Sequence, residues 1–463
     1  MKHNPIIINN LDLILPHKIC FQNFSAIISY GDRIAIIGRN GSGKSALLNY
    51  IHSSNLIKLP NNAVLGYVPQ IIDGFNNLSG GERFNKYLTQ CMQKNPNVLL
   101  LDEPSNHLDR HNFQSLTKML NNYQGTLIIA SHNKDLLNAC NILWHIDGGK
   151  ITIFHGNYSN YVNKLQQNRD SLSQNLKNLR KQKREVHESL MKEQIRTAKS
   201  KAKGQKNIAD KKWTKMAGGL KTSESQNSQG KKFKNIEADM QNIADDLRNI
   251  RLPEVILPKF TMAENNTANT AVLQINNGKI YYKNGFSIHN INLTLQGRAK
   301  LAITGRNGSG KSSLLRAIIN KDTNIIREGN WFTPAVADIG YLSQHYDNLN
   351  LYDSVIANIE CLVPQWTMLE LRDYLNSFLF SKNEEVNARA ITLSGGEKAR
   401  LSLAKIILNP PKLLLLDEIT NNLDLETIEY VAGVLRNYQG AMIIVSHDDN
   451  FLAEIGIVDF YKI

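Results

Sequence analysis

Short runs of apolar residues recur along the chain, and polar or glycine-rich segments separate them. RIAIIG (33–38) and KLAITG (300–305) each lead into a glycine-rich turn and then a helix-like pattern, SALLNYI or SSLLRAII. The runs NVLLL, TLIIA, KLLLL and AMIIV are apolar throughout, which is typical of strands buried on both faces of a parallel sheet. Because such strands alternate with helical segments, the pattern predicts an α/β fold with a mostly parallel sheet, formed twice.

The region between these two α/β segments has a helical pattern instead. From Tyr158 to about Lys203 the chain lacks proline and glycine, and its leucines recur at three-to-four and seven-residue spacing. Glycines at 204, 218, 219 and 230 interrupt the pattern, and residues 231–251 resume it. Because neither helix can bury its apolar stripe alone, we expect an antiparallel helical hairpin. The predicted domains are 1–157, 158–258 as an interdomain linker, and 259–463.

Composition and charge single out this linker. The chain is 42% hydrophobic and 21% charged, which is ordinary for a globular protein. No apolar run approaches the roughly 20 residues that span a bilayer, we expect no signal peptide, and four cysteines without CxxC spacing favour a cytoplasmic protein. The net charge is +13, and residues 177–234, with 18 Lys or Arg against 5 Asp or Glu, account for all of it. The basic character therefore belongs to the linker.

The two α/β segments are copies of one unit. GRNGSGKS occurs at 38–45 and 305–312, an offset of 267 residues, whereas LSGGE, an Asp-Glu pair and a Ser-His pair recur at an offset of 315. Most of the additional residues in the second copy follow Gln344, while only IIDGFNN separates Gln70 from LSGGE in the first. The first copy therefore lacks an insertion that the second copy contains.

GRNGSGKS matches the phosphate-binding loop pattern G-x-x-x-x-G-K-[ST] and follows a predicted strand, as that pattern requires. The glycines allow backbone N–H groups to surround phosphate oxygens at the start of a helix. The lysines would contact the β- and γ-phosphates, and the last serines would bind Mg²⁺. The candidate nucleotide-binding residues are Gly38, Arg39, Asn40, Gly41, Ser42, Gly43, Lys44 and Ser45, with Gly305, Arg306, Asn307, Gly308, Ser309, Gly310, Lys311 and Ser312.

Other repeated polar residues supply candidates for catalysis. Asp102 and Asp417 end buried strands, where they could hold Mg²⁺, and the adjacent Glu103 and Glu418 could orient or deprotonate an attacking water. His132 and His447 follow a third strand and are candidate γ-phosphate sensors. The other predicted Mg²⁺ ligands are Gln70, Gln344, Ser45 and Ser312. Each signal has an ordinary alternative, a solvated strand end, which its recurrence in both copies disfavours.

LSGGE predicts a second anion-binding surface in each copy. Ser79, Gly80 and Gly81, and likewise Ser394, Gly395 and Gly396, would open a helix without bulky side chains at its N-terminus. If the two copies pair head to tail, each such helix would cap the nucleotide of the other copy.

The order of phosphate loop, glutamine, LSGGE, Asp-Glu and histidine resembles an ATP-binding cassette ATPase, twice over. SNHLD (105–109) and NNLD (421–424) are similar to the D-loop of that family. The resemblance implies two P-loop cassettes with ATP and Mg²⁺ bound between them, and Glu103 and Glu418 as catalytic residues. Ile419 stands where the family usually has proline. The adenine-stacking aromatic would be Tyr282 in the second copy, whereas the first has an aliphatic residue near Leu15.

The basic helical linker between tandem cassettes resembles the ABC-F family, whose members act on the ribosome. Its cations would bind ribosomal RNA and tRNA phosphates, and the predicted contacts are Lys201, Lys203, Lys206, Lys211, Lys212, Trp213 and Lys215. An ordinary solvated helix face, with Trp213 packed between the helices, is the alternative. The shortened first copy resembles members that protect ribosomes from large-subunit antibiotics. A general translation or ribosome-assembly factor, or the ATPase subunit of a membrane exporter, is the other possibility. We expect a monomer whose cassettes pair within the chain, without membrane contact.

Overall fold

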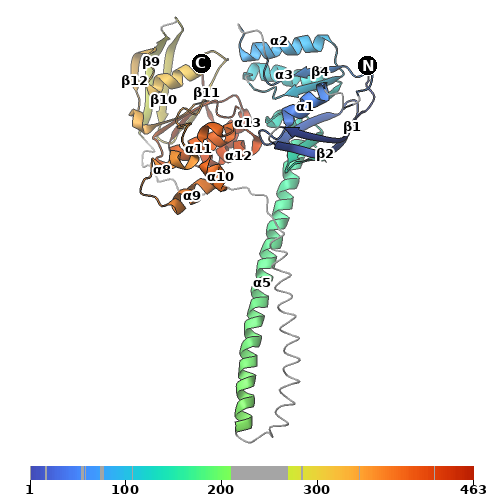
Figure 1. The fold of residues 1–463 in the computed structure, drawn as a ribbon. Helices are drawn as coiled ribbons and strands as arrows, with labels where there is room; N and C mark the ends of the chain where they lie inside the picture. Colours follow the sequence, from blue (N-terminus) through green and yellow to red (C-terminus); the bar gives the residue numbers. More distant parts are fainter. Residues whose placement is uncertain are drawn as a thin grey trace. The chain divides into compact units, whose positions relative to one another are not determined.

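The computed structural model describes residues 2–15, 18–53, 57, 59–72, 78–106, 108–209, 270–282, 285–343, 345–421 and 423–463. The chain divides into two compact units (Figure 1). One unit consists of Met1–Tyr158 with Ile256–Ile463, and the other is Ser159–Val255. We refer to the elements from Ile6 to His155 as the first copy and to those from Ala271 to Lys462 as the second copy.

The first copy is built on a six-stranded sheet with the order β4-β5-β6-β3-β7-β8. Neighbouring strands in it are parallel except that β8 pairs antiparallel with β7, and a separate antiparallel hairpin is formed by β1 and β2. The strand bounds are β1 Ile6–Leu15, β2 Lys18–Ile28, β3 Arg33–Gly38, β4 Leu65–Val68, β5 Val98–Asp102, β6 Thr126–Ala130, β7 Ile142–Asp147 and β8 Lys150–His155. The helices of this copy are α1 Lys44–Ser53, α2 Gly80–Gln93, α3 Arg110–Asn122 and α4 Lys134–Asn138.

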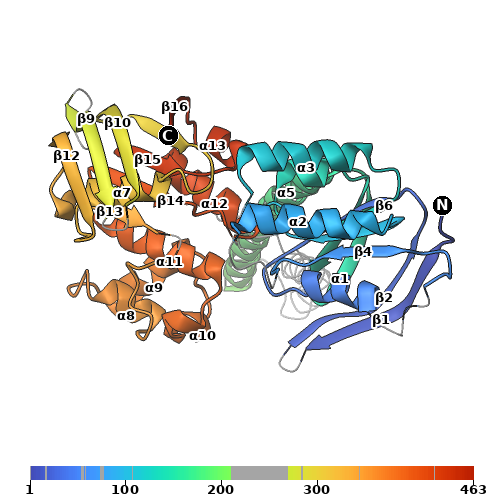
Figure 2. The same cartoon turned by 90° about the horizontal axis from the view of Figure 1, so that it is seen from above.

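The second copy repeats this plan with a five-stranded parallel sheet in the order β13-β14-β15-β11-β16 and an antiparallel sheet β10-β9-β12 (Figure 2). Its strands are β9 Ala271–Tyr282, β10 Ser287–Gln296, β11 Lys300–Thr304, β12 Ile325–Phe332, β13 Ile339–Leu342, β14 Leu413–Asp417, β15 Ala441–Val445 and β16 Asp459–Lys462. Its helices are α7 Lys311–Ile319, α8 Val355–Glu360, α9 Met368–Ser377, α10 Asn383–Asn387, α11 Gly395–Leu408, α12 Leu425–Arg436 and α13 Asp449–Glu454, with 3₁₀ turns at Val336–Asp338 and Ala390–Thr392.

The prediction of strands buried on both faces is confirmed. Every residue of β5, β6, β14 and β15 is buried, because helices and the antiparallel sheets cover both faces. The residues that the second copy has in addition contain α8, α9 and α10. Phe378 and Phe380 from this segment are buried in the same hydrophobic core as β14 and β15.

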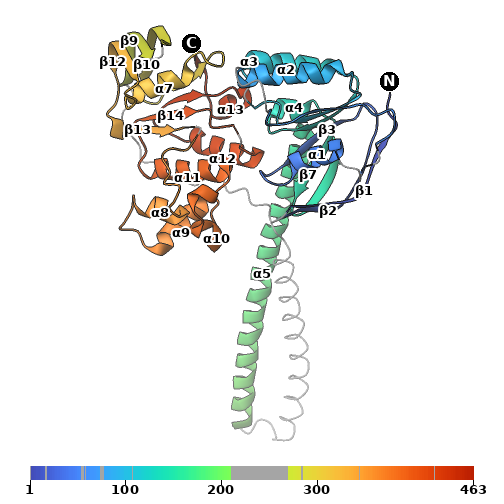
Figure 3. The same ribbon diagram turned by 45° about the horizontal axis from the view of Figure 1, so that its top comes forward.

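Helix α5, Tyr158–Ala209, is a single helix of 52 residues (Figure 3). The expectation that Gly204 interrupts it is wrong, because the helix continues past this glycine to Ala209. One glycine costs about 1 kcal/mol relative to alanine, which the surrounding Ala, Lys and Gln residues tolerate. The leucines at 172, 176 and 179 are half-buried and lie among exposed residues, as the helical stripe predicts. The second helix predicted at 231–251 lies outside the described residues.

Candidate nucleotide-binding sites

The two glycine-rich loops have the same conformation and the same lysine contacts. In the first copy, Lys44 Nζ donates to the carbonyls of Gly38 and Arg39 at 2.8 and 3.3 Å. In the second copy, Lys311 Nζ contacts the carbonyls of Gly305 and Arg306 at 3.1 and 3.0 Å. Burial lowers the pKa of both lysines, so each is a desolvated cation at the start of a helix.

The first glycine of each loop has no room for a side chain. A Cβ atom at Gly38 would lie 2.7 Å from the carbonyl oxygen of Ile146 and 2.7 Å from Ser42 Oγ. A Cβ at Gly305 would lie 2.7 Å from Ser309 Oγ. The Oγ atoms of Ser42 and Ser309 are buried without a hydrogen-bond partner among the described residues. These buried hydroxyls and the adjacent lysines fit an anionic ligand, such as a chain of phosphates.

The serine that ends each loop contacts the aspartate that ends a buried strand. Ser45 Oγ donates to Asp102 Oδ1 at 3.1 Å, and Ser312 Oγ donates to Asp417 Oδ1 at 2.9 Å. Burial raises the pKa of Asp102, against the opposing effect of the Ser45 hydrogen bond. In the second copy, Tyr341 Oη also donates to Asp417, to Oδ2 at 3.1 Å. A hydroxyl beside a carboxylate is the donor set from which Mg²⁺ takes one or two protein ligands together with phosphates.

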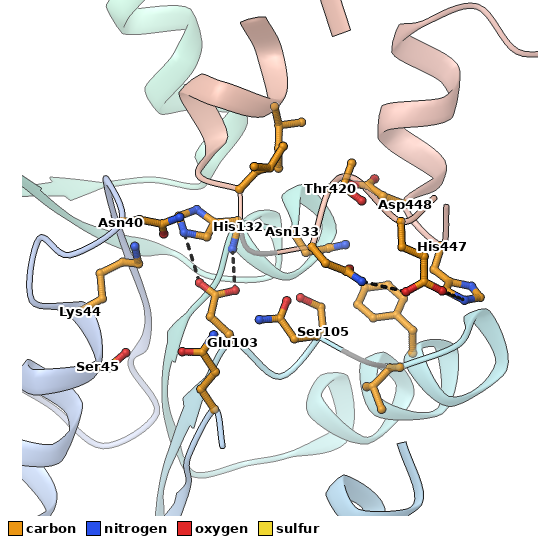
Figure 4. A pocket seen from close by; sticks show the side chains of 18 of the residues that line it. Asn40, Lys44, Ser45, Glu103, Ser105, His132, Asn133, Thr420, His447 and Asp448 are labelled. Atoms are coloured by element: carbon orange, nitrogen blue, oxygen red, sulfur yellow. Dashed lines mark hydrogen bonds and ion pairs between the residues drawn. The ribbon is translucent and has the colours of Figure 1, made fainter. Parts of the chain in front are cut away.

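Glu103 and His132 face each other in the first copy (Figure 4). Glu103 Oε1 lies 3.4 Å from His132 Nε2, and Glu103 Oε2 accepts a hydrogen bond from the backbone N–H of His132 at 3.3 Å. Burial raises the pKa of Glu103 to about 8, although Lys44 opposes the shift. Burial, together with the charge of Lys44, lowers the pKa of His132 to about 3. The imidazole is therefore neutral at pH 7.

Glu418 and His447 form the equivalent pair in the second copy, with wider spacing and more solvent access. Glu418 Oε1 lies 3.7 Å from His447 Nε2, and their side chains are 24% and 20% exposed, against 8% and 10% for Glu103 and His132. Asn421 Nδ2 donates to Glu418 Oε2 at 2.9 Å. Burial and the Lys311 charge lower the pKa of His447 to about 4.

Both glutamates have positive φ angles, 45° for Glu103 and 49° for Glu418. A non-glycine residue in this left-handed region costs on the order of 1–3 kcal/mol and is characteristic of functional sites. The backbone N–H of each glutamate bonds to the carbonyl of the neighbouring strand, at Ala130 and Val445 respectively. The strained backbone of each glutamate is thereby tied to the strand beside the one that it follows.

A cavity of about 440 Å³ contains residues of both copies (Figure 4). Its lining includes Lys44, Ser45, Gln70, Glu103 and His132 from the first copy. The lining from the second copy comprises Asn307, Glu418, Thr420, Asn421, Leu423, Ile428, His447 and Asp448.

The aspartate of each D-loop lies beside the other copy's site. The backbone N–H of Asn40 donates to Asp424 Oδ2 at 3.3 Å, and the charge of Asp424 acts on Lys44. Conversely, the charge of Asp109 acts on Lys311 and on His447. The two copies are thus related head to tail at their D-loops.

The LSGGE motifs begin α2 and α11. Ser79 is the N-cap of α2 and forms a capping box with Glu82, and Ser394 forms the same arrangement with Glu397 at α11. Gly80, Gly81, Gly395 and Gly396 form the first turns of these helices. None of the residues Ser79–Gly81 or Ser394–Gly396 belongs to the lining of the cavity described above.

Several predicted residues fall where the structure gives no side-chain description. Gln344 lies outside the described residues, as do Lys211, Lys212, Trp213 and Lys215. Lys201, Lys203 and Lys206 belong to helix α5.

The residues predicted near the adenine lie at strand ends. Tyr282 ends β9, and its ring centroid lies 6.0 Å from that of Phe286. Leu15 ends β1.

Sequence reasoning missed the polar residues that support the acid pairs. Asn421, Tyr341 and Asp424 contact Glu418, Asp417 and the first phosphate loop, respectively. Asn421 and Asp424 lie within the D-loop motif, so their position next to the acid pair was a usable signal. Tyr341 has a counterpart in Tyr67, three residues before Gln70, but only the parallel pairing of β13 with β14 brings it near Asp417.

Comparison with known proteins agrees with this geometry. The family model for ABC transporter matches residues 288–421. The chain is 27% identical over 501 residues to ATP-binding protein Uup of Buchnera aphidicola subsp. Schizaphis graminum, covering 96% of this chain and 79% of that protein. It is 28% identical over 482 residues to ribosome protection protein VmlR of Bacillus subtilis, covering 96% of this chain and 84% of that protein.

Among solved structures, the complex of an archaeal ribosomal stalk protein with the archaeal ribosome recycling factor aABCE1 matches with a TM-score of 0.58. The match covers 93% of this chain and 83% of that chain at 14% identity, which shows a shared fold. Two α/β copies with phosphate loops, acid pairs and LSGGE helices define an ATP-binding cassette protein that hydrolyses ATP.

Within that class the chain is similar over 96% of its length to Uup and VmlR, which are relatives of the ABC-F family. Helices in the part of the chain that the structure describes are too short or too polar to cross a membrane.

Proposed function

We propose that this protein is a cytoplasmic ABC-F ATPase that binds the ribosome with ATP and leaves it after hydrolysis. We further propose that it protects the ribosome from antibiotics that act on the large subunit. The observation that carries the proposal is the combination of two ATP-binding copies with the basic helix α5. The similarity to ribosome protection protein VmlR over 96% of this chain supports the finer assignment.

The nucleotide would bind through the phosphate loops. Lys44 and Lys311 are desolvated cations that interact with the charges of Glu103 and Glu418 and of the other copy's D-loop aspartate. An ATP phosphate chain would give each lysine a mobile anionic partner in a water-poor site, where the attraction is strong. The Ser42 and Ser309 hydroxyls, which lack partners among the described residues, are further donors for phosphate oxygens.

Ser45 with Asp102, and Ser312 with Asp417, would hold Mg²⁺ together with phosphate oxygens, and Gln70 and Gln344 are candidates for the same ion. Bound there, the cation would neutralise charge that develops on the transferring phosphoryl group. The hydrogen bond from Tyr341 keeps the second oxygen of Asp417 oriented.

Glu103 and Glu418 would orient the attacking water and accept its proton. Both glutamates line the cavity that His132 and His447 also line. Because both imidazoles are neutral at pH 7, each can donate one N–H bond to a γ-phosphate oxygen without adding a charge. Ser79–Gly81 and Ser394–Gly396 would contribute helix N-termini to the phosphates when the cassettes close.

Helix α5 would be the ribosome-binding element. It contains 13 Lys or Arg and four Asp or Glu, and residues such as Lys177, Lys181 and Arg184 are exposed. A helix with this charge favours a phosphate backbone, because binding releases condensed counterions. The residues Lys201, Lys203, Lys206, Lys211, Lys212, Trp213 and Lys215 would then contact ribosomal RNA or tRNA.

The test replaces both catalytic candidates. A Glu103→Gln/Glu418→Gln protein should bind ATP without hydrolysing it and should cosediment with ribosomes in ATP but not in ADP. Failure of this variant to cosediment would contradict ribosome action. Cryo-EM of the trapped complex would locate the linker.

Two growth measurements then separate the possible roles. If deletion sensitises cells to large-subunit antibiotics and leaves drug-free growth unchanged, ribosome protection is supported. A growth defect without any drug would instead indicate a general translation or ribosome-assembly factor. Copurification with a membrane protein, with loss of drug efflux on deletion, would indicate the ATPase subunit of an exporter.

A further inference from the structure

Among the described residues, four ion pairs join the first copy to the second, and in each the cation belongs to the first copy. Arg39 Nε lies 2.9 Å from Glu426 Oε2, and Arg110 Nη2 lies 3.1 Å from Asp449 Oδ2. Lys134 Nζ lies 3.2 Å from Glu454 Oε1 and 3.6 Å from Glu429 Oε1. The residues that carry these contacts come from the first phosphate loop and from α3, α4, α12 and α13.

Lys134 and Asp449 are equivalent positions in the two copies. Each comes two residues after the histidine of its Ser-His pair, and the two are separated by the same 315 residues as those pairs. Lys134 faces Glu429 on α12, and Asp449 faces Arg110 at the start of α3. By the same offset, α3 and α12 are equivalent helices. The equivalent residues Lys134 and Asp449 thus each contact the equivalent helix of the other copy, one turn apart along it, with the charges exchanged.

This exchange makes the contact selective. If two first copies paired in the same way, Lys134 would face Arg110, and two cations would meet. If two second copies paired, Asp449 would face Glu429, and two carboxylates would meet. Only a first copy against a second copy satisfies both contacts, and like charges at the alternatives disfavour them.

Lys134 is the centre of this arrangement. Its side chain is 24% exposed and lies between two carboxylates that are 48% and 29% exposed. Burial raises the pKa of Glu429, and Lys134 opposes the shift. A partly desolvated lysine between two carboxylates contributes more than a fully exposed pair does, because water screens it less.

We infer that these charged residues form a polarity code that selects the second copy of the same chain as the partner of the first and opposes pairing of identical copies. Arg110 and Lys134 are the cationic half of the code, and Asp449, Glu429 and Glu454 are the anionic half. The Arg39–Glu426 pair joins the copies without selecting between them, because the second copy has Arg306 at the position equivalent to Arg39. The code predicts that the two cassettes of one monomeric chain pair with each other and that added salt weakens this pairing.

A charge-exchange cycle in the full-length protein tests this inference. The variants are Arg110→Glu, Asp449→Lys and the double variant, each compared with wild type and with Lys150→Glu, which changes an exposed lysine of β8. Closure is measured by energy transfer between a dye on the exposed Cys361 and a dye on Gln90→Cys, in saturating ATP. Sedimentation velocity reports association between chains.

Each single variant should lower the closed-to-open ratio by about 3–10-fold, the range expected for losing one pair and gaining one repulsion. The double variant, with its charges exchanged, should return to within about twofold of the wild-type ratio. The control Lys150→Glu should have the same closed-to-open ratio as wild type. At about 1 M salt, where the Debye length falls to about 3 Å, the differences should largely disappear.

A second cycle uses Lys134→Glu with Glu429→Lys and Glu454→Lys, and it should show the same loss and recovery. The inference fails if a double or triple variant closes no better than its worst parent. It also fails if the single variants close like wild type at low salt. Stable dimers of wild-type chains held together by identical copies would overturn it as well.

Discussion

At the scale of single residues, the two candidate catalytic glutamates have different surroundings. Glu103 is more buried and closer to its histidine than Glu418, which accepts a hydrogen bond from Asn421. Charge on Glu103 is disfavoured by burial, because a desolvated carboxylate loses its hydration. The two copies therefore give one chemical group two different environments.

The first prediction concerns the pH dependence of Glu103. Hydrolysis by a Glu418→Gln protein, in which only Glu103 remains as base, should increase as the pH rises toward about 8, where Glu103 loses its proton. Steady-state ATPase measurements from pH 6 to 9 check this. A rate that is flat or that falls over this range would contradict the assignment of Glu103 as a buried base.

The free energy of unfolding should change in the opposite direction. Between pH 4.5 and about 8 the folded protein retains the Glu103 proton, while the unfolded chain has released it. Stability therefore decreases as the pH rises through this window. Glu103→Gln should remove that contribution, so urea denaturation at pH 6 and pH 8.5 should show a smaller loss in the variant than in wild type.

A second prediction concerns Asn421. Asn421→Ala removes the 2.9 Å hydrogen bond to Glu418, and a bond to a charged group contributes about 1.5–3 kcal/mol. In a Glu103→Gln background, kcat should fall by about tenfold with little change in KM, because the base loses orientation and ATP still binds. The matched control is Asn106→Ala, at the equivalent position of the first copy, which should leave this background nearly unchanged.

At the scale of elements, helix α5 shows how far local propensity decides structure. Its 52 residues are rich in Lys, Gln, Leu and Ala, and each favours the helix by a small amount that adds up over the length. The helix therefore continues through Gly204 and does not end there. The short helices α4, α8, α10 and α13 depend instead on caps and on tertiary contacts.

Gly204 offers a direct test of this balance. Gly204→Ala should stabilise the helix by about 1 kcal/mol, and Gly204→Pro should destabilise it by about 3 kcal/mol. Thermal melts followed by circular dichroism at 222 nm check both changes. ATP hydrolysis should be unaffected, since Gly204 is remote in sequence from both nucleotide sites. Equal melting curves for the two variants would show that the helix does not pass through this residue.

At the scale of the whole molecule, the net positive charge and the ATP-binding motifs lie in different parts of the chain. The cassettes and their flanking residues are neutral overall, and residues 177–234 contain the excess of positive charge. Because helix α5 carries much of this excess, ribosome affinity and its salt dependence should depend on this helix. ATP chemistry should depend on the cassettes.

The corresponding variant replaces five exposed or nearly exposed cations of α5 with glutamine: Lys177, Arg180, Lys181, Lys183 and Arg184. Ribosome binding by the ATP-trapped protein should weaken, and the slope of log affinity against log salt should become shallower by several units, since each lost phosphate contact removes up to about 0.9. Filter binding at several salt concentrations measures both.

The control replaces five exposed cations of the cassettes with glutamine: Lys118, Lys150, Arg298, Lys321 and Lys462. It has the same change in net charge. If this control weakens binding as much as the α5 variant does, the effect is one of net charge, and the proposed role of α5 is wrong.

Much of the fold could be predicted because its signals are local. The buried strands, the helices that follow the phosphate loops, and the helices that begin at LSGGE each depend on a few neighbouring residues. The recurrence of Asp-Glu and Ser-His at one offset also identified the candidate residues around Glu103 and Glu418. The contact from Tyr341 to Asp417 could not be predicted, because it depends on strand order.

The sequence by itself determined that the protein has two copies of a phosphate-binding α/β unit, and that its net positive charge lies between them. Backbone propensity, apolar patterning and repeated motifs act over short stretches of chain and can be read there. Only the tertiary structure decided that Lys134 lies between Glu429 and Glu454 and that Asp424 reaches the first phosphate loop. These contacts join residues about 300 or more positions apart, and their geometry follows from how the two copies pack.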